Sequence, residues 1–121
     1  MTWRIEFAAE AERDFGLIFD HLYASYLEFG EGRDEAAGHA AQRVEDILNE
    51  AERIADAPHR GATHDDLLPG LRHLTLGRAI FWFTLDEADR CVRILAIFFG
   101  GQDHQRHMLV RLLQKPEESP P

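Results

Sequence analysis

The hydrophobic pattern of the opening segment changes its period once. Residues 3–7 (WRIEF) alternate apolar and charged side chains, which predicts a short strand with one buried face. From Ala8 to Phe29 the apolar side chains recur every three or four positions, which predicts an amphipathic helix about 33 Å long. Gly30 and Gly32 favour a turn over a helix interior, so we expect the helix to end there.

A second helical pattern follows the glycine turn. Asp34 is a candidate N-cap, and apolar side chains recur at helical spacing from there to Asp56. Alanines occupy the inward positions of the first two turns, and small residues allow two helices to approach closely. We therefore predict an antiparallel helical hairpin. The segment Ala57–Pro58 ends the second helix, because proline disfavours a helical conformation in the residue before it.

The second half of the chain carries strand patterns. Residues 58–70 (PHRGATHDDLLPG) are rich in turn residues and predict a connecting loop. The runs 71–76, 78–85 and 90–99 are predicted to form an antiparallel meander, the last two being rich in β-branched and aromatic residues. The last run is apolar enough to predict a central strand that is covered on both faces.

A short terminal helix completes the predicted architecture. Residues 103–113 carry apolar side chains at helical spacing, and Asp103 is a candidate N-cap. We predict an α+β domain in which a small antiparallel sheet, made of the N-terminal strand and the meander, packs against the helical hairpin. Residues 1–115 are assigned to this single domain, and we expect residues 116–121 (PEESPP) to form a flexible tail.

Composition places these elements in a small acidic domain with an uneven charge distribution. The 121 residues include 13 Lys and Arg against 22 Asp and Glu, a formal net charge of -9. Residues 1–60 hold 14 of the acids and 6 of the bases, whereas residues 61–121 hold 8 and 7. Because binding to phosphates requires a basic surface, any contact with nucleic acid would depend on local clusters of arginine.

The cysteine content and the lack of long apolar segments bear on the compartment. The single cysteine, Cys91, excludes an internal disulfide and fits a reducing compartment. Acidic side chains lie where a signal peptide would have its apolar core, and no run approaches about 18 apolar residues. We therefore expect a cytoplasmic protein that is neither secreted nor membrane-spanning.

Five short segments are informative through their order and spacing: residues 3–22 (WRIEFAAEAERDFGLIFDHL), 58–61 (PHRG), 66–74 (DLLPGLRHL), 78–95 (RAIFWFTLDEADRCVRIL) and 100–103 (GGQD). Together they resemble the RelE/ParE superfamily of toxins from type II toxin-antitoxin systems. The resemblance covers about residues 3–113. It implies a toxin of a plasmid-stabilisation type of module, without a cofactor, that forms a hetero-oligomer with a cognate antitoxin protein.

The resemblance implies one of two activities. Toxins that resemble RelE cleave mRNA on the ribosome, whereas toxins that resemble ParE poison DNA gyrase. The long paired helices and the PGLR segment at 69–72 are more similar to the ParE branch. Metal-free RNA cleavage needs groups that accept and donate protons beside the phosphate. Many relatives have His and Arg where this sequence has Phe99 and Gln102, so the resemblance favours gyrase poisoning over enzymatic activity.

Two other functions stay open at this point. In a ribosome-dependent mRNA endonuclease, Arg60, Arg72 or Arg78 would bind the phosphate and a histidine such as His104 would move a proton. The three arginines could converge if the loop and the meander bring them together. The alternative for each arginine is ordinary exposure to solvent or pairing with an acid. The replacements at the proton-transfer positions also fit a non-toxic relative that only binds an antitoxin.

Aromatic residues and arginines are the candidates for contact with an antitoxin or a target. We expect the aromatic residues of the last two strands mainly in the core, and some of them in a groove for a partner helix. The predicted contact residues are Arg72, Arg78, Trp82, Phe99 and Asp103.

The histidines of the second half raise the question of a metal. His104 and His107 lie three residues apart on a predicted helix, and Asp103, His59 or His64 could complete a zinc site. No HExxH or CxxC motif accompanies them, and Asp103 suits a helix cap. We therefore predict neither a metal nor a cofactor.

Overall fold

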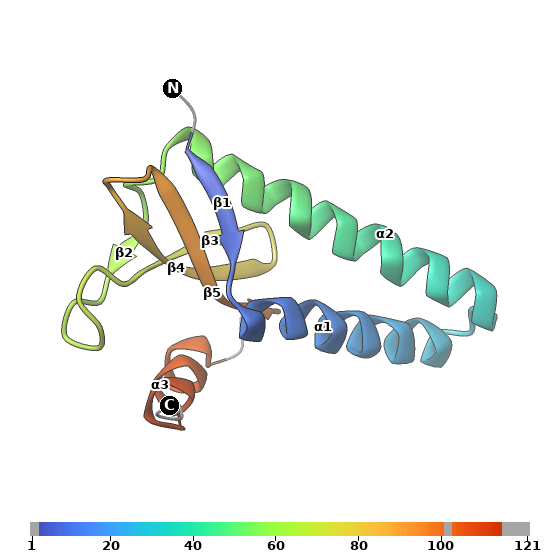
Figure 1. The fold of residues 1–121 in the computed structure, drawn as a ribbon. Helices are drawn as coiled ribbons and strands as arrows, with labels where there is room; N and C mark the ends of the chain where they lie inside the picture. Colours follow the sequence, from blue (N-terminus) through green and yellow to red (C-terminus); the bar gives the residue numbers. More distant parts are fainter. Residues whose placement is uncertain (1–2, 101–102, 115–121) are drawn as a thin grey trace.

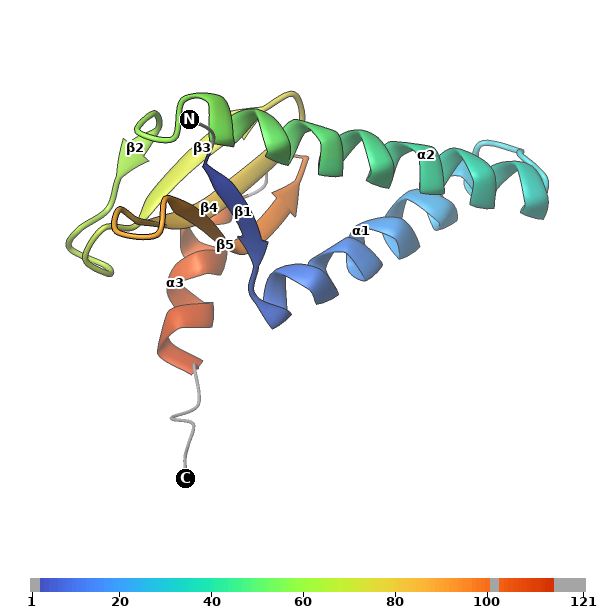
Figure 2. The same ribbon diagram turned by 45° about the horizontal axis from the view of Figure 1, so that its top comes forward.

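A five-stranded sheet with the strand order β1-β5-β4-β3-β2 forms the centre of the fold (Figures 1 and 2). The computed structural model describes residues 3–100 and 103–114. The predicted tail and Gln102 lie outside these residues. The elements are β1 (Arg4–Phe7), α1 (Ala9–Glu28), α2 (Arg33–Glu52), the 3-10 helix η1 (Arg53–Asp56), β2 (Ala62–Thr63), β3 (Arg72–Leu76), β4 (Ala79–Asp86), β5 (Cys91–Phe99) and α3 (His104–Gln114).

The N-terminal strand lies at an edge of the sheet, and its direction corrects the prediction of a wholly antiparallel sheet. β1 runs parallel to β5, in a register that pairs Arg4 with Cys91 and Phe7 with Ile94. The meander β3-β4-β5 is antiparallel, so the sheet is mixed. The direction of β1 depends on where the chain returns after the helices and the meander, and no local pattern in the sequence contains that information.

The helical hairpin is confirmed, with two changes at the ends of α2. The N-cap is Gly32 and not Asp34, and the chain continues past Glu52 as the 3-10 helix η1. Ala40 and Ala51 are fully buried, which agrees with close approach of small residues. Near the turn, the ring of Tyr26 stacks on that of His39 at 3.7 Å between centroids. In Figures 1 and 2 the turn end of the hairpin projects beyond the sheet.

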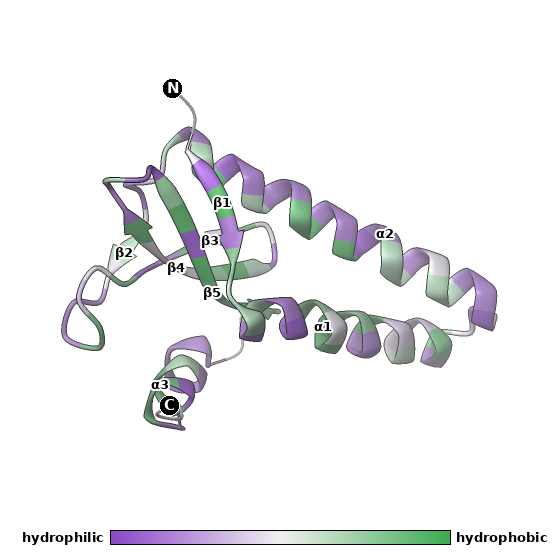
Figure 3. Cartoon of the chain, in the orientation of Figure 1, coloured by the Kyte–Doolittle hydropathy of each residue, from purple (hydrophilic) through white to green (hydrophobic). Residues whose placement is uncertain are grey.

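Each face of the sheet carries its own hydrophobic core. The α1–α2 hairpin covers one face, where Phe81 and Phe83 are fully buried. The helix α3 covers the other face, where Met108 packs with Trp82. β5 is an interior strand covered on both faces, as predicted, although β4 holds the middle position of the sheet. Figure 3 shows the matching contrast between the mainly hydrophobic strands of the meander and the mainly hydrophilic surface of α2.

The predicted loop 58–70 contains the short strand β2, which pairs with β3. Gly61 precedes β2 with a φ of 98°, and a Cβ there would collide with the backbone carbonyl oxygen of His73. Only glycine therefore fits at this close approach. None of the helices in the described part of the chain combines the length and apolar character that a membrane crossing requires.

Candidate functional site: a groove between α1 and α3

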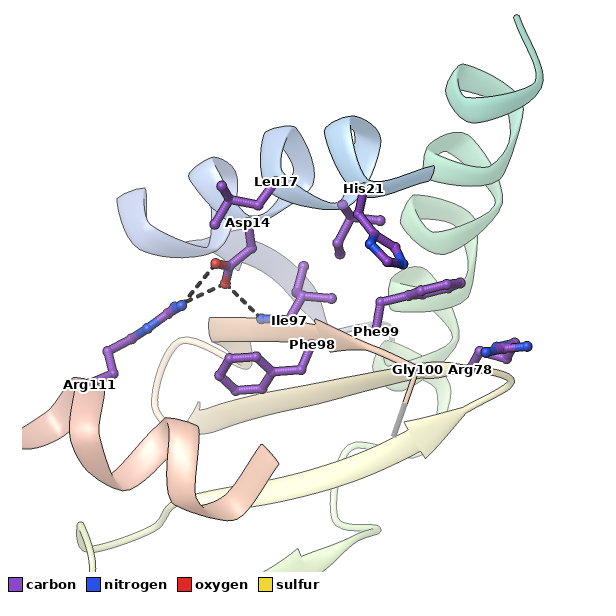
Figure 4. Close-up of a pocket in the computed structure, with 10 residues that line it drawn as sticks. Asp14, Leu17, His21, Arg78, Ile97, Phe98, Phe99, Gly100 and Arg111 are labelled. Carbon is purple, nitrogen blue, oxygen red and sulfur yellow. Dashed lines mark hydrogen bonds and ion pairs between the residues drawn. The ribbon is translucent and has the colours of Figure 1, made fainter. Parts of the chain in front are cut away.

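A groove opens between α1 and α3 beside the end of β5 (Figure 4). Its volume is ≈ 430 Å³. The helix α1 forms one wall, the last residues of β5 form the floor, and two arginines stand at its ends. This α1–α3 groove is lined by Asp14, Leu17, Ile18 and His21 of α1, by residues 97–100, by Arg78 of the β3–β4 turn, and by Arg111 of α3.

The floor of the groove is aromatic and cationic. Consecutive residues of a strand point to opposite faces, so Phe98 belongs to the α3 side and Phe99 to the hairpin side. The guanidinium of Arg78 lies 5.5 Å from the centroid of the Phe99 ring, and that of Arg111 lies 5.3 Å from the Phe98 ring. Both distances allow a cation–π attraction. The groove therefore offers ring surfaces that lie next to two guanidinium groups.

A buried ion pair fixes the geometry of the groove. Asp14 is only 4% exposed, and its two carboxylate oxygens accept hydrogen bonds of 2.9 Å from the two terminal nitrogens of Arg111. The backbone N–H of Ile97 donates a further bond of 2.9 Å to Asp14 Oδ2. Figure 4 shows these three bonds converging on one side chain. Asp14 thus ties α1, β5 and α3 together.

The groove has little capacity for acid–base chemistry. The Asp14 carboxylate is occupied on both oxygens, and Phe99 carries no titratable group. Of the side chains that line the groove, His21 alone offers a free proton-transfer group beside the arginines. An arrangement of aromatic rings and guanidinium groups suits recognition of a peptide that carries apolar side chains and a carboxylate.

The three predicted arginines do not converge, which corrects that expectation. Arg60 donates hydrogen bonds to the carbonyl oxygens of Ala57 and Arg53, so it closes the turn after α2. Arg72 donates to the carbonyl oxygen of His59 at 3.0 Å. Arg72 begins β3, whereas Arg78 follows its end, so a strand of five residues, about 17 Å, separates them. The three arginines therefore do not form one phosphate site in this structure.

The structure brings only some of the predicted contact residues together in the groove. Arg78 and Phe99 meet in the α1–α3 groove, whereas the exposed Asp103 is not among its lining residues. Trp82 is fully buried, so it offers no contact surface while α3 covers it. Trp82 faces the α3 side of the central strand β4, and α3 covers it there. The sequence pattern shows that Trp82 belongs to a strand, but it does not show that both faces of the strand are covered.

A cluster of imidazoles surrounds Trp82, and sequence reasoning missed it. His64 Nε2 lies 2.7 Å from His73 Nδ1, and the indole N–H of Trp82 donates to His104 Nδ1 at 3.2 Å. The rings of His73 and His104 lie 4.7 Å apart between centroids. We call His64, His73, His104 and Trp82 the imidazole cluster. The register of β3 and β4, which pairs His73 with Trp82, is the signal that could have revealed it.

Burial and mutual repulsion disfavour positive charge on two members of the imidazole cluster, His73 and His104. Burial, then the neighbouring His104 and His64, lower the pKa of His73 to about 4. Burial and His64 also lower the pKa of His104, and the Asp103 carboxylate only partly opposes this. Both imidazoles are therefore neutral at pH 7.

The histidines considered for a zinc site make different contacts in the structure. His107 packs beside Phe98 at 5.8 Å between ring centroids, whereas His104 belongs to the imidazole cluster. His59 pairs with Glu87 at 2.9 Å. In residues 3–100 and 103–114, no group of three or more His, Cys, Asp or Glu side chains is arranged to hold a metal ion.

Comparison with known proteins places the fold. No family model matches the sequence, and no curated protein matches it either. Solved structures do match. The chromosomal ParDE toxin-antitoxin system from P. aeruginosa superposes with a TM-score of 0.59 at 23% identity, covering 80% of this chain and 95% of that chain.

Two other similar structures are a RelBE2 complex and a RelE toxin. The RelBE2 toxin-antitoxin complex from Mycobacterium tuberculosis has a TM-score of 0.59 at 13% identity and covers 84% of this chain and 95% of that chain. A mutant of E. coli toxin RelE in the free state has a TM-score of 0.56 at 8% identity, with coverages of 92% and 97%. The chain therefore has the α+β fold of the RelE/ParE toxins.

Proposed function

We propose that this protein is the toxin of a type II toxin-antitoxin module, and that it acts by binding its target, DNA gyrase, and not by cleaving RNA. The α1–α3 groove carries this proposal, because it combines aromatic and arginine side chains with an Asp14 carboxylate that is already fully bonded. The fold supports it, since similar structures are those of toxins and toxin-antitoxin complexes.

The chemistry of the groove defines the antitoxin that would occupy it. Phe99 and Leu17 offer apolar surface, and Leu17 is 65% exposed. Arg78 is exposed beside them and offers a cation to a carboxylate. An amphipathic segment with an Asp or Glu next to its apolar positions fits this surface. The protein itself carries a net charge of -9, so local pairing with Arg78, and not bulk attraction, would orient such a segment.

The antitoxin part of the proposal is tested by co-purification. A small reading frame beside this gene is expected to encode a protein with a DNA-binding head and an amphipathic tail. Co-expression should yield a stable complex, and Arg78→Ala should weaken it. Arg33→Ala is the matched control, since Arg33 is also exposed but lies at the far end of the hairpin. Equal losses for both variants would remove the groove from the proposal.

The target is tested with purified components. We expect the free protein to inhibit supercoiling by DNA gyrase, and the antitoxin to restore it. Toeprinting of ribosomes in the presence of the protein serves as the counter-experiment, with no new cleavage expected. Cleavage of mRNA on the ribosome together with unaffected gyrase would overturn the proposed mode of action. Normal growth after strong induction without antitoxin would instead indicate a non-toxic antitoxin-binding relative.

A further inference from the structure

The helix α3 is held on the sheet at two points of different chemistry. At its C-terminal half, Arg111 forms the bidentate ion pair with Asp14. At its first residue, His104 accepts the indole N–H of Trp82. Between these points Met108, 1% exposed, packs in the core on this face of the sheet. The position of α3 on the sheet therefore depends on a few side chains.

The bond between Trp82 and His104 exists in only one protonation state. An indole N–H is a donor and never an acceptor, so His104 Nδ1 must present a lone pair, and its proton must lie on Nε2. An imidazolium carries protons on both nitrogens. Protonated His104 would therefore place a second donor against the indole N–H and lose this anchor.

The contact between His64 and His73 restricts protonation in a similar way. A distance of 2.7 Å between His64 Nε2 and His73 Nδ1 requires a proton on one nitrogen and a lone pair on the other. One positive charge can be accommodated in this pair, but two cannot. The ring of His73 also lies against His104, so charges on these two residues repel each other as well.

We propose that the imidazole cluster is a proton-sensitive latch for α3: in its neutral form it holds the first turn of the helix on the sheet, and protonation releases that turn. Release would uncover the apolar surface around Trp82, Leu71 and Ile80, which α3 now covers. The ion pair between Asp14 and Arg111 would keep the C-terminal half of α3 attached. The opening is therefore local.

The charged groups around the imidazole cluster determine whether acid favours the latched or the released state of α3. His64 approaches from the segment after β2, His73 from β3, and His104 from α3, and each adds positive charge when protonated. The Asp103 carboxylate favours protonation of His104 but does not outweigh burial and His64. Because the latched state lowers the pKa of His73 to about 4 and also lowers that of His104, acid favours the released state, in which these two imidazoles return towards their ordinary pKa of 6.5.

The fluorescence of Trp82 reports the latch directly. The chain has two tryptophans, so Trp3→Phe leaves Trp82 as the sole emitter. We expect a reversible red shift of its emission between pH 6.5 and 4, with far-UV circular dichroism mostly retained. Hydrogen exchange, corrected for the intrinsic pH effect, should show at least a tenfold loss of protection in the first turns of α3 and no loss in α1.

One substitution separates the latch from other acid effects, including protonation of Asp14. In His104→Asn the amide oxygen can still accept the indole N–H, but the side chain no longer titrates. This variant should keep α3 seated at neutral pH and shift or abolish the fluorescence step. The control is His107→Asn, an exposed histidine on the same helix, which should leave the step unchanged. An unchanged step in His104→Asn, or simultaneous loss of protection in α1 and α3, would overturn the proposal.

Discussion

The two faces of the sheet are covered in contrasting ways. On one face the α1–α2 hairpin contributes two helices of 20 residues each and a large apolar core. On the other face a single helix of 11 residues is seated by Met108, the Trp82–His104 hydrogen bond and the Asp14–Arg111 ion pair. The hairpin face buries the larger apolar core. The α3 face depends more on polar contacts, which the binding of a partner, protonation or a substitution can change.

The largest expected effect comes from the hairpin face. Phe83→Ala should lower the free energy of unfolding by about 3–5 kcal/mol, because Phe83 is fully buried and the truncation leaves a cavity. Met108→Ala should instead detach α3, with a smaller loss of global stability. Urea denaturation and hydrogen exchange of α3 measure the two effects. Similar global losses for both variants would mean that the two faces unfold as one unit.

A smaller but still substantial effect is expected at the ion pair that joins the faces. Arg111→Met should cost about 3 kcal/mol, because it leaves the buried Asp14 carboxylate without its cation. The double variant Asp14→Leu with Arg111→Met should recover only part of that loss, because it leaves no unpaired buried charge but removes the acceptor of the Ile97 N–H. A double-mutant cycle by chemical denaturation gives the coupling energy. A coupling near zero would show that the pair does not fix the groove.

The groove itself can be altered without changing the stability of the domain. Arg78 is exposed, and we expect Arg78→Ala to leave the unfolding free energy unchanged. Its affinity for the antitoxin should fall by roughly tenfold, on the order of one charge-assisted hydrogen bond. Calorimetric titration measures the binding, with Arg33→Ala as the control. An unchanged affinity would place the antitoxin elsewhere on the surface.

A further expected effect is the pH dependence of the α3 face. His73 has a pKa of about 4 in the folded chain against 6.5 in the unfolded chain, so its contribution to stability is fully present above pH 6.5. That contribution is lost as the pH falls from 6.5 towards 4. Titration of the His73 ring by NMR should give the low pKa, and His104→Asn should raise it by removing a neighbouring charge. An ordinary pKa for His73 would contradict the packing of the imidazole cluster.

Local patterns predicted most of the elements of this fold. Period 2 in residues 3–7 and helical spacing up to Asp56 led to a strand and a hairpin that the structure confirms. These signals work because they depend on neighbours within one or two turns or a few residues of strand. The pairing of strands and the burial of their faces depend on residues that are far apart in the sequence. Arg72 and Arg78 looked close in sequence but lie at opposite ends of β3, and Trp82 proved to be covered on its outward face.

The sequence by itself determined the order of the elements, the position of the glycine turn and the concentration of acids in the first half of the chain. Only the tertiary structure decided that β1 runs parallel to β5, that Asp14 meets Arg111 and that three histidines from separate segments surround Trp82. The physical reason is the range of the interactions. Periodicity and turn preferences act between near neighbours, whereas a groove or a cluster forms where the packing of whole elements brings distant residues together.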